Sequence, residues 1–147
     1  MCYASTLYPC LTHEENTFYA VNRKDLNFGL YRDCAIYSPR VYFPEDDFYA
    51  DVITCPAPNN YRYTKVSPKD MDAALEQRIK FMYGVVAQQK DIDTLIVGAW
   101  GCGVFRQNPY SVAKFLKQYK NYSGIRNIIC AVPDQRSQNY KAFASVI

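Results

Sequence analysis

The sequence has few of the residue patterns that mark common metal and cofactor sites. His13 is the only histidine, and none of the six cysteines belongs to a Cys-x-x-Cys pair, so a zinc site is not expected. The patterns GxxxxGK[ST] and GxGxxG are both missing, which excludes a P-loop and the dinucleotide-binding fingerprint. We therefore expect neither a metal nor a cofactor.

Long apolar runs and clusters of charge are also lacking. No apolar run is long enough to span a membrane, and the first residues do not follow the charged-then-apolar pattern of a signal peptide. The net charge is only +3 and the basic residues are scattered, so no nucleic-acid partner is expected. Several cysteines lie in apolar runs, as reduced thiols do in a cytoplasmic protein. We expect a cytoplasmic location without membrane contact.

The second half of the chain alternates apolar runs with capped helices. Val52–Thr54, Leu95–Val97 and Ile128–Val132 are typical of buried strands. Helices are expected to begin near Pro68, Pro109 and Ser137. This order predicts an α/β, three-layer domain in which the three strands share one mainly parallel or mixed central sheet. The nearly continuous apolar run at 128–132 favours a sheet covered on both faces.

The first half is less regular. Residues 1–11 are interpreted as the back half of a helix, and short strands are expected at 35–37 and 41–43. Thr12 and Glu15 fit the capping box S/T-x-x-E, so we interpret Glu14 and Glu15 as structural rather than catalytic.

A glycine-rich stretch stands between an expected strand and an expected helix. Gly98, Gly101 and Gly103 lie within six residues. Such a loop can bring backbone N–H groups close to an anion, although a tight connection without a ligand would have the same pattern. Ligands of α/β folds bind beyond the carboxyl ends of strands, where this loop and the segment CPAPNN (55–60) are both expected to lie.

Four phrases of the sequence resemble a known family. GAWGCGVF (98–105), IYSPRV (36–41), ITCPAPN (53–59) and CYASTLYPCL (2–11) are similar to segments of the microbial-type poly(ADP-ribose) glycohydrolases. The resemblance implies a macrodomain fold whose glycine-rich loop wraps the diphosphate and distal ribose of ADP-ribose. It also implies that residues 1–147 form a single macrodomain-like domain, N-terminally shortened relative to the family.

The resemblance assigns roles within the loop. Backbone N–H groups of Cys102, Gly103 and Val104 would face the phosphates, and Phe105 would lie against the distal ribose. The candidate ligand-binding residues are Gly98, Ala99, Trp100, Gly101, Cys102, Gly103, Val104, Phe105, Asn59 and Tyr140.

Several of these candidates have an ordinary structural explanation as well. Trp100 either walls the loop or packs in the core, and we favour the core. Arg106 either reaches a phosphate or is solvated. Asn59 is either a polar contact of the ligand or a turn residue. Tyr140 is a candidate neighbour of the adenine, which needs an aromatic or apolar slot.

Three functions are compatible with the sequence. The family's GGG and QEE motifs do not occur in these 147 residues, so the resemblance assigns no catalytic residue. Cleavage of a ribosyl bond needs a positioned carboxyl group as general acid. We therefore favour binding of ADP-ribose or a related adenine nucleotide without hydrolysis. The alternatives are a truncated or split glycohydrolase, whose glutamate segment is missing or supplied by another chain, and an interaction module with an unused cleft. An unpaired strand edge would also favour a homo-oligomer.

Overall fold

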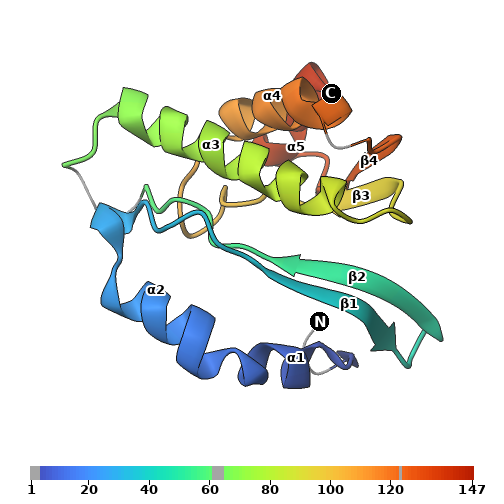
Figure 1. The fold of residues 1–147 in the computed structure, drawn as a ribbon. Helices are drawn as coiled ribbons and strands as arrows, with labels where there is room; N and C mark the ends of the chain where they lie inside the picture. Colours follow the sequence, from blue (N-terminus) through green and yellow to red (C-terminus); the bar gives the residue numbers. More distant parts are fainter. Residues whose placement is uncertain (1–3, 61–64, 123) are drawn as a thin grey trace.

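The computed structural model describes residues 4–60, 65–122 and 124–147, and its elements form three layers (Figure 1). The first layer contains the helices α3 (Pro68–Ala87), α4 (Pro109–Tyr119) and α5 (Gln138–Val146). The strands form the middle layer, and α1 (Leu7–His13) and α2 (Ala20–Lys24) lie on the far side of it. The expected α/β, three-layer and macrodomain-like fold class is confirmed.

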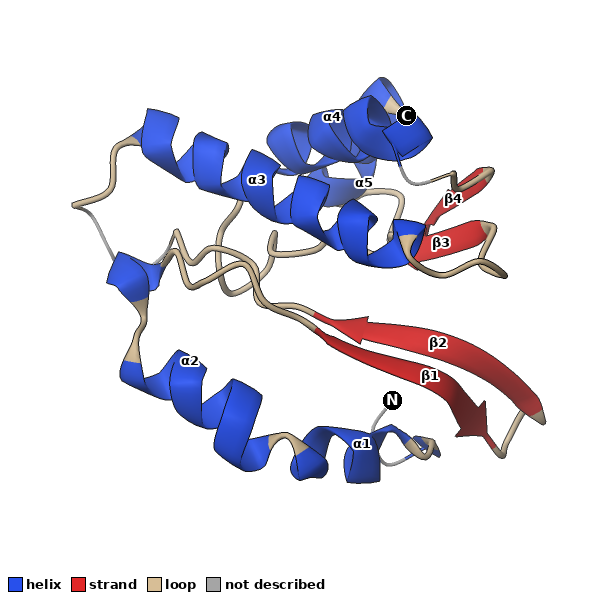
Figure 2. Cartoon of the chain, viewed as in Figure 1, coloured by secondary structure: helices blue, strands red, loops and turns tan. Residues whose placement is uncertain are grey.

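The strands form two separate pairs (Figure 2). β1 (Ile36–Phe43) and β2 (Phe48–Thr54) form an antiparallel hairpin, whose register shifts between Ser38 and Val41. β3 (Thr94–Val97) and β4 (Asn127–Cys130) pair in parallel. The short turns are η2 (Glu15–Tyr19), η3 (Asn27–Gly29) and η4 (Lys120–Tyr122).

The prediction of one central sheet is wrong for the residues that the structure describes. β2 bonds only to its hairpin neighbour β1, whereas β3 bonds only to β4. Apolar runs identify strands but carry no information on which edges pair, and a hairpin partner is the nearest one in the chain. The two strands predicted at 35–37 and 41–43 are parts of the single strand β1.

The prediction that the last strand is covered on both faces is also wrong. Ile96 of β3 pairs with Ile129 of β4, and these two residues are 66% and 52% exposed. Val97, the residue after Ile96, is buried, because alternate side chains point to opposite faces of a strand. Within the described ranges, one face of this pair of strands is therefore covered and the other is open.

The three long helices begin where their capping residues predict. The Ser67 Oγ accepts a hydrogen bond from the Asp70 N–H (3.1 Å), and the Asn108 Oδ1 accepts one from the Tyr110 N–H (2.9 Å). The Ser137 Oγ caps α5 in the same way. Each bond satisfies one of the N–H groups that a helix leaves unpaired at its start.

The core lies between α3, α4, α5 and the strands. One apolar face of α3 is buried: Met71, Leu75, Ile79, Met82 and Val86 are each at most 5% exposed. Ile53 of β2 packs against the same cluster as Val97 of β3, so the two pairs of strands share one core although they do not share hydrogen bonds. Among the described residues, no helix is long and apolar enough to cross a membrane.

The capping box predicted at Thr12 and Glu15 is not formed. Thr12 lies inside α1, where its hydroxyl donates to the carbonyl oxygens of Tyr8 (3.1 Å) and Pro9 (3.0 Å). Glu15 forms an exposed ion pair with Arg23 instead (2.7 Å). The pattern misled because a helix already runs through Thr12, and a hydroxyl there bonds back to the preceding turn.

Candidate functional site

The glycine-rich loop follows β3 directly and is folded into tight turns. The Trp100 N–H donates to the Gly98 carbonyl oxygen (2.8 Å), and the Cys102 N–H donates to the Ala99 oxygen (3.0 Å). The N–H groups of Gly103 and Val104 donate to no other residue in the described ranges. Val104 is 82% exposed, so these two donors lie at the open tip of the loop.

Gly101 and Gly103 of this loop differ in whether a side chain could be accommodated there. Gly101 has φ +74°, and a Cβ built there would lie 2.8 Å from the Ala57 Cβ. Gly101 is therefore required by the fold of the loop itself. A Cβ at Gly103 would meet nothing within 4 Å, so Gly103 borders open space.

The segment after β2 is bonded to the loop along its length. The Trp100 indole N–H donates to the Cys55 carbonyl oxygen (3.2 Å), and the Asn60 N–H donates to the Phe105 oxygen (2.9 Å). The Gln107 side-chain amide donates to the Pro58 oxygen (2.6 Å). The two segments that the sequence placed at strand ends thus form one surface.

Gln107 was not predicted from the sequence. It is only 3% exposed, and its amide fixes the end of the loop to the proline-rich segment. Its place just before the capping Asn108 gives no hint of this, because its partner lies 49 positions away in the chain.

The remaining candidate residues differ in how deeply they are buried. Trp100 packs against the core cluster, as favoured from the sequence. Asn59 is buried, and its N–H donates to the Gly29 carbonyl oxygen (2.7 Å). Arg106 is exposed, with φ +52°. Tyr140 is half-buried in the first turn of α5, where its N–H donates to the Ser137 Oγ (3.0 Å). Whether Asn59 or Tyr140 touches a ligand stays a prediction.

The thiols beside the site are neutral at physiological pH. Burial raises the pKa of Cys102 to about 11 and is the main cause that raises the pKa of Cys55 to about 12. A thiol that keeps its proton adds no negative charge. An anion at the loop would therefore meet no thiolate from Cys102.

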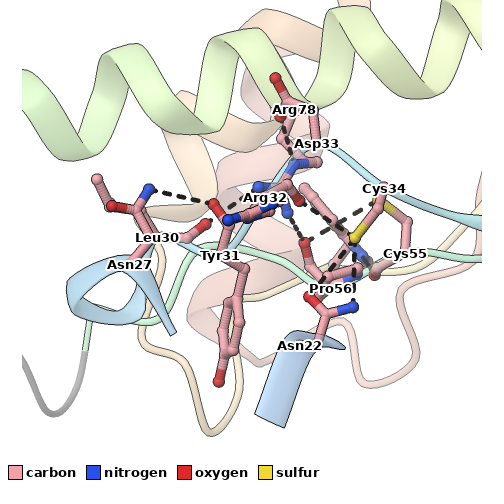
Figure 3. A network of polar contacts seen from close by, with 11 residues as sticks. Asn22, Asn27, Leu30, Tyr31, Arg32, Asp33, Cys34, Cys55, Pro56 and Arg78 are labelled. Carbon is pink, nitrogen blue, oxygen red and sulfur yellow. Dashed lines mark hydrogen bonds and ion pairs between the residues drawn. The ribbon is translucent and has the colours of Figure 1, made fainter. Parts of the chain in front are cut away.

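A buried arginine holds the neighbouring segment in place (Figure 3). Arg78 of α3 is 2% exposed, and its Nε lies 2.7 Å from the Asp33 Oδ1. One terminal nitrogen donates to the Leu30 carbonyl oxygen (3.0 Å) and the other donates to the Pro56 oxygen. One side chain thus joins α3, the segment before β1 and the segment after β2.

The role of Arg78 was not predicted from the sequence, although its position in α3 gives a signal. Position 78 lies within the stripe formed by Leu75, Ile79 and Met82, where a charged residue is expected only if it is paired. A cavity of about 300 Å³ lies beside this network, lined by Asn27, Leu30, Tyr31, Arg32, Asp33, Ala74, Gln77 and Arg78. None of these lining residues belongs to the glycine-rich loop, whose tip is open surface.

The arrangement defines a class of protein. A parallel pair of strands with a glycine-rich loop at its carboxyl end, in a domain whose helices form two outer layers, is the arrangement of a layered α/β domain with a ligand loop. The family model of the microbial-type PARG catalytic domain, PARG being poly(ADP-ribose) glycohydrolase, matches residues 1–46. The chain resembles the microbial-type poly(ADP-ribose) glycohydrolases over nearly its whole length, as solved structures show.

Two bacterial structures illustrate the resemblance. The glycohydrolase of Deinococcus radiodurans, in its T267R form with ADP-ribose, is 31% identical and has a TM-score of 0.84, over 98% of this chain and 64% of that one. The Thermomonospora curvata enzyme bound to the inhibitor ADP-HPD is 27% identical with a TM-score of 0.85, over 98% of this chain and 59% of that one. The chain thus spans less than two thirds of either structure. No curated protein is significantly similar to it.

Proposed function

We propose that the chain binds ADP-ribose or a related adenine nucleotide through residues 98–105, without hydrolysing it. The observation that carries this proposal is the pair of N–H groups of the exposed residues Gly103 and Val104, which have no partner among the described residues and lie near the end of the loop that follows β3. Backbone N–H groups that lack a partner are strong donors to phosphate oxygens. The similar Deinococcus radiodurans protein was crystallised with ADP-ribose, which supports this choice of ligand.

Binding without hydrolysis is proposed for these residues taken alone. The motifs that the family resemblance links to cleavage, GGG and QEE, do not occur among them. Glu15 is paired with Arg23, and Glu14 accepts a bond from the Thr17 hydroxyl, both in the layer of α1 and α2. The isolated chain should therefore release little or no ADP-ribose from polymer. Release that is lost on Glu14→Ala or Glu15→Ala would contradict this.

Calorimetric titration with ADP-ribose, ADP, NAD and AMP tests the binding proposal. The variant Gly103→Val places a side chain where the phosphates would lie, and the open space around Gly103 should leave the fold intact. One hydrogen bond to a charged group is worth about 1.5–3 kcal/mol, and about 1.4 kcal/mol is a factor of ten in affinity. We expect Gly103→Val to weaken ADP-ribose binding by roughly tenfold or more.

Gly84→Val is the matched control, because Gly84 in α3 is also free of neighbours within 4 Å of a Cβ. Melting curves of both variants show whether weaker binding comes from damage to the binding site or from unfolding of the protein. If the parent binds none of the four nucleotides, or if folded Gly103→Val binds as well as the parent, the loop is only a tight turn. The chain would then be an interaction module.

A second candidate function is a truncated or split glycohydrolase completed by another segment. It is favoured by the two separate pairs of strands and by the exposed face at Ile96 and Ile129. Polymer hydrolysis that appears only when the chain is mixed with the unmatched part of the Deinococcus radiodurans enzyme would favour this alternative. Absence of hydrolysis in a mixture whose components associate would count against it.

A further inference from the structure

Residues 104–147 carry far more positive than negative charge. They contain seven of the seventeen basic residues of the chain but only one of its fourteen acidic residues, Asp134. The basic residues are thus spread along the whole chain, whereas the acidic residues are almost confined to positions 1–103. The net charge of +3 combines +6 in residues 104–147 with −3 in the residues before them. Such a charge asymmetry indicates a surface for an anionic partner.

The fold brings this part of the chain together as two packed helices. Leu116 of α4 and Phe143 of α5 are buried in the same core cluster, and both helices lie in one outer layer (Figure 1). Lys114 and Lys117 of α4 and Lys141 of α5 are exposed. Lys114 and Lys117 are three residues apart, so they lie on the same side of α4. The exposed surface of the two helices is therefore basic.

Neighbouring carboxylates do not neutralise these lysines. Among the described residues, none of Lys114, Lys117 and Lys141 takes part in an ion pair. The Lys117 Nζ donates to the Val146 carbonyl oxygen (2.7 Å), which ties α4 to the end of α5 and leaves the charge of the lysine uncancelled. Glu76 of α3 does reach α4, but its carboxylate accepts bonds from a glutamine and a tyrosine there.

The basic surface adjoins the glycine-rich loop. α4 begins at Pro109, four residues after Phe105 ends the loop, and α5 begins at Gln138, after the end of β4. Because β3 and β4 are parallel, both helices begin at the edge of the strands where the loop lies. A long anionic ligand could therefore contact the loop and the two helices at once.

We propose that the exposed side of α4 and α5 binds a chain of ADP-ribose units that extends beyond the unit held by the loop. This inference rests on the proposed function. Each further unit brings a diphosphate and an adenine. The lysines attract the diphosphate, and Tyr110, which is 51% exposed and lies four residues before Lys114, offers a ring on which a base can stack. A nucleic acid has the same kinds of group, but it has no ADP-ribose unit for the loop.

The test measures binding of poly(ADP-ribose), of ADP-ribose and of single-stranded DNA with as many phosphates as the polymer, over a series of salt concentrations. The variant Lys114→Gln/Lys141→Gln removes two exposed charges, and Lys117 is left intact because it also bonds to α5. The control is Lys24→Gln/Lys90→Gln, which removes two exposed lysines outside α4 and α5. Melting curves show that both variants are folded.

Each lysine that contacts a phosphate should contribute about 0.7–1 to the slope of log affinity against log salt. We expect Lys114→Gln/Lys141→Gln to reduce that slope for the polymer by about 1–2 and to weaken polymer binding by about tenfold or more near 50 mM salt. ADP-ribose binding by this variant, and polymer binding by the control, should stay within about twofold of the parent.

Three outcomes would overturn the proposal. If the parent binds ADP-ribose but the loss of the two lysines leaves polymer binding unchanged, or weakens it no more than the control does, the basic surface is refuted while the proposed function stands. If the parent binds the DNA as tightly as the polymer and loses both equally, the partner is a nucleic acid. If the parent binds neither ADP-ribose nor the polymer, both proposals fail.

Discussion

Replacement of Gly101 by alanine should destabilise the protein, whereas the same change at Gly103 should not. At Gly101 the new methyl group would lie 2.8 Å from the Ala57 Cβ and 3.0 Å from the Gln107 Cγ, on a backbone with φ +74°. The left-handed backbone costs an alanine about 1–2 kcal/mol, and forcing a methyl group into a packed site costs about 1–3 kcal/mol. We expect a loss of about 3 kcal/mol in the free energy of unfolding.

For a chain of this size, about 3 kcal/mol corresponds to a fall of roughly 6–12 °C in Tm. Scanning calorimetry of Gly101→Ala and Gly103→Ala gives the comparison directly. Gly103→Ala should stay within roughly 2 °C of the parent, because its φ is not positive and a Cβ there meets no neighbour. Equal Tm values for the two variants would refute the reasoning.

A double variant separates the cost of the backbone conformation at Gly101 from the cost of the contact with Ala57. Ala57→Gly removes the atom that the new methyl group would touch most closely, but it leaves φ at Gly101 unchanged. Relative to Ala57→Gly alone, adding Gly101→Ala should then cost less than it does in the parent, but at least the backbone part of about 1–2 kcal/mol, because the Gln107 Cγ still lies 3.0 Å from the new methyl group. If the cost is the same in both backgrounds, the contact with Ala57 contributes nothing, and the backbone conformation and the contact with Gln107 account for the cost.

Two further predictions follow from buried polar groups. Arg78→Met leaves two carbonyl oxygens and the Asp33 carboxylate without their partner, and water can reach the 35% exposed Asp33 side chain; we therefore expect a loss of about 2–3 kcal/mol, measured by urea unfolding, and a loss under about 1 kcal/mol would contradict the role of the network. The thiols of Cys55 and Cys102 have a higher pKa in the fold than the usual value of about 8.5. The unfolded chain therefore releases these protons first, and stability should fall as pH rises from about 8.5 toward 11, as melting curves against pH would show. Cys55→Ser and Cys102→Ser should each flatten that fall, and an unchanged slope would contradict the assignment.

The sequence predicted those parts of the fold that depend on local chemistry. The helix starts at Ser67 and Asn108 were found because a cap and its N–H partner lie within three residues of each other. The loop at 98–105 was placed correctly because it directly follows an apolar strand. The capping box at Thr12 was wrong for the same local reason, since the pattern does not reveal whether a helix has already begun.

Contacts between segments far apart in the chain could not be predicted from local sequence patterns. The partners of Arg78 lie 22, 45 and 48 positions away along the chain. The rings of Tyr31 and Phe105 meet with centroids 6.1 Å apart, although the two residues lie in segments far apart in the chain, so their contact could not be read from either segment alone. The pairing of the strands was missed because every strand edge carries the same backbone groups.

The exposed isoleucine pair, Ile96 and Ile129, has a practical consequence for handling the protein. Ile96 and Ile129 lie side by side on the open face of β3 and β4, and β3 has no described strand on its other edge. An apolar face next to unpaired backbone groups attracts other copies of the same surface. Encounters between two copies grow with the square of the protein concentration. The chain should therefore store well when dilute and precipitate on concentration, and a single lysine in place of Ile129 should delay that precipitation.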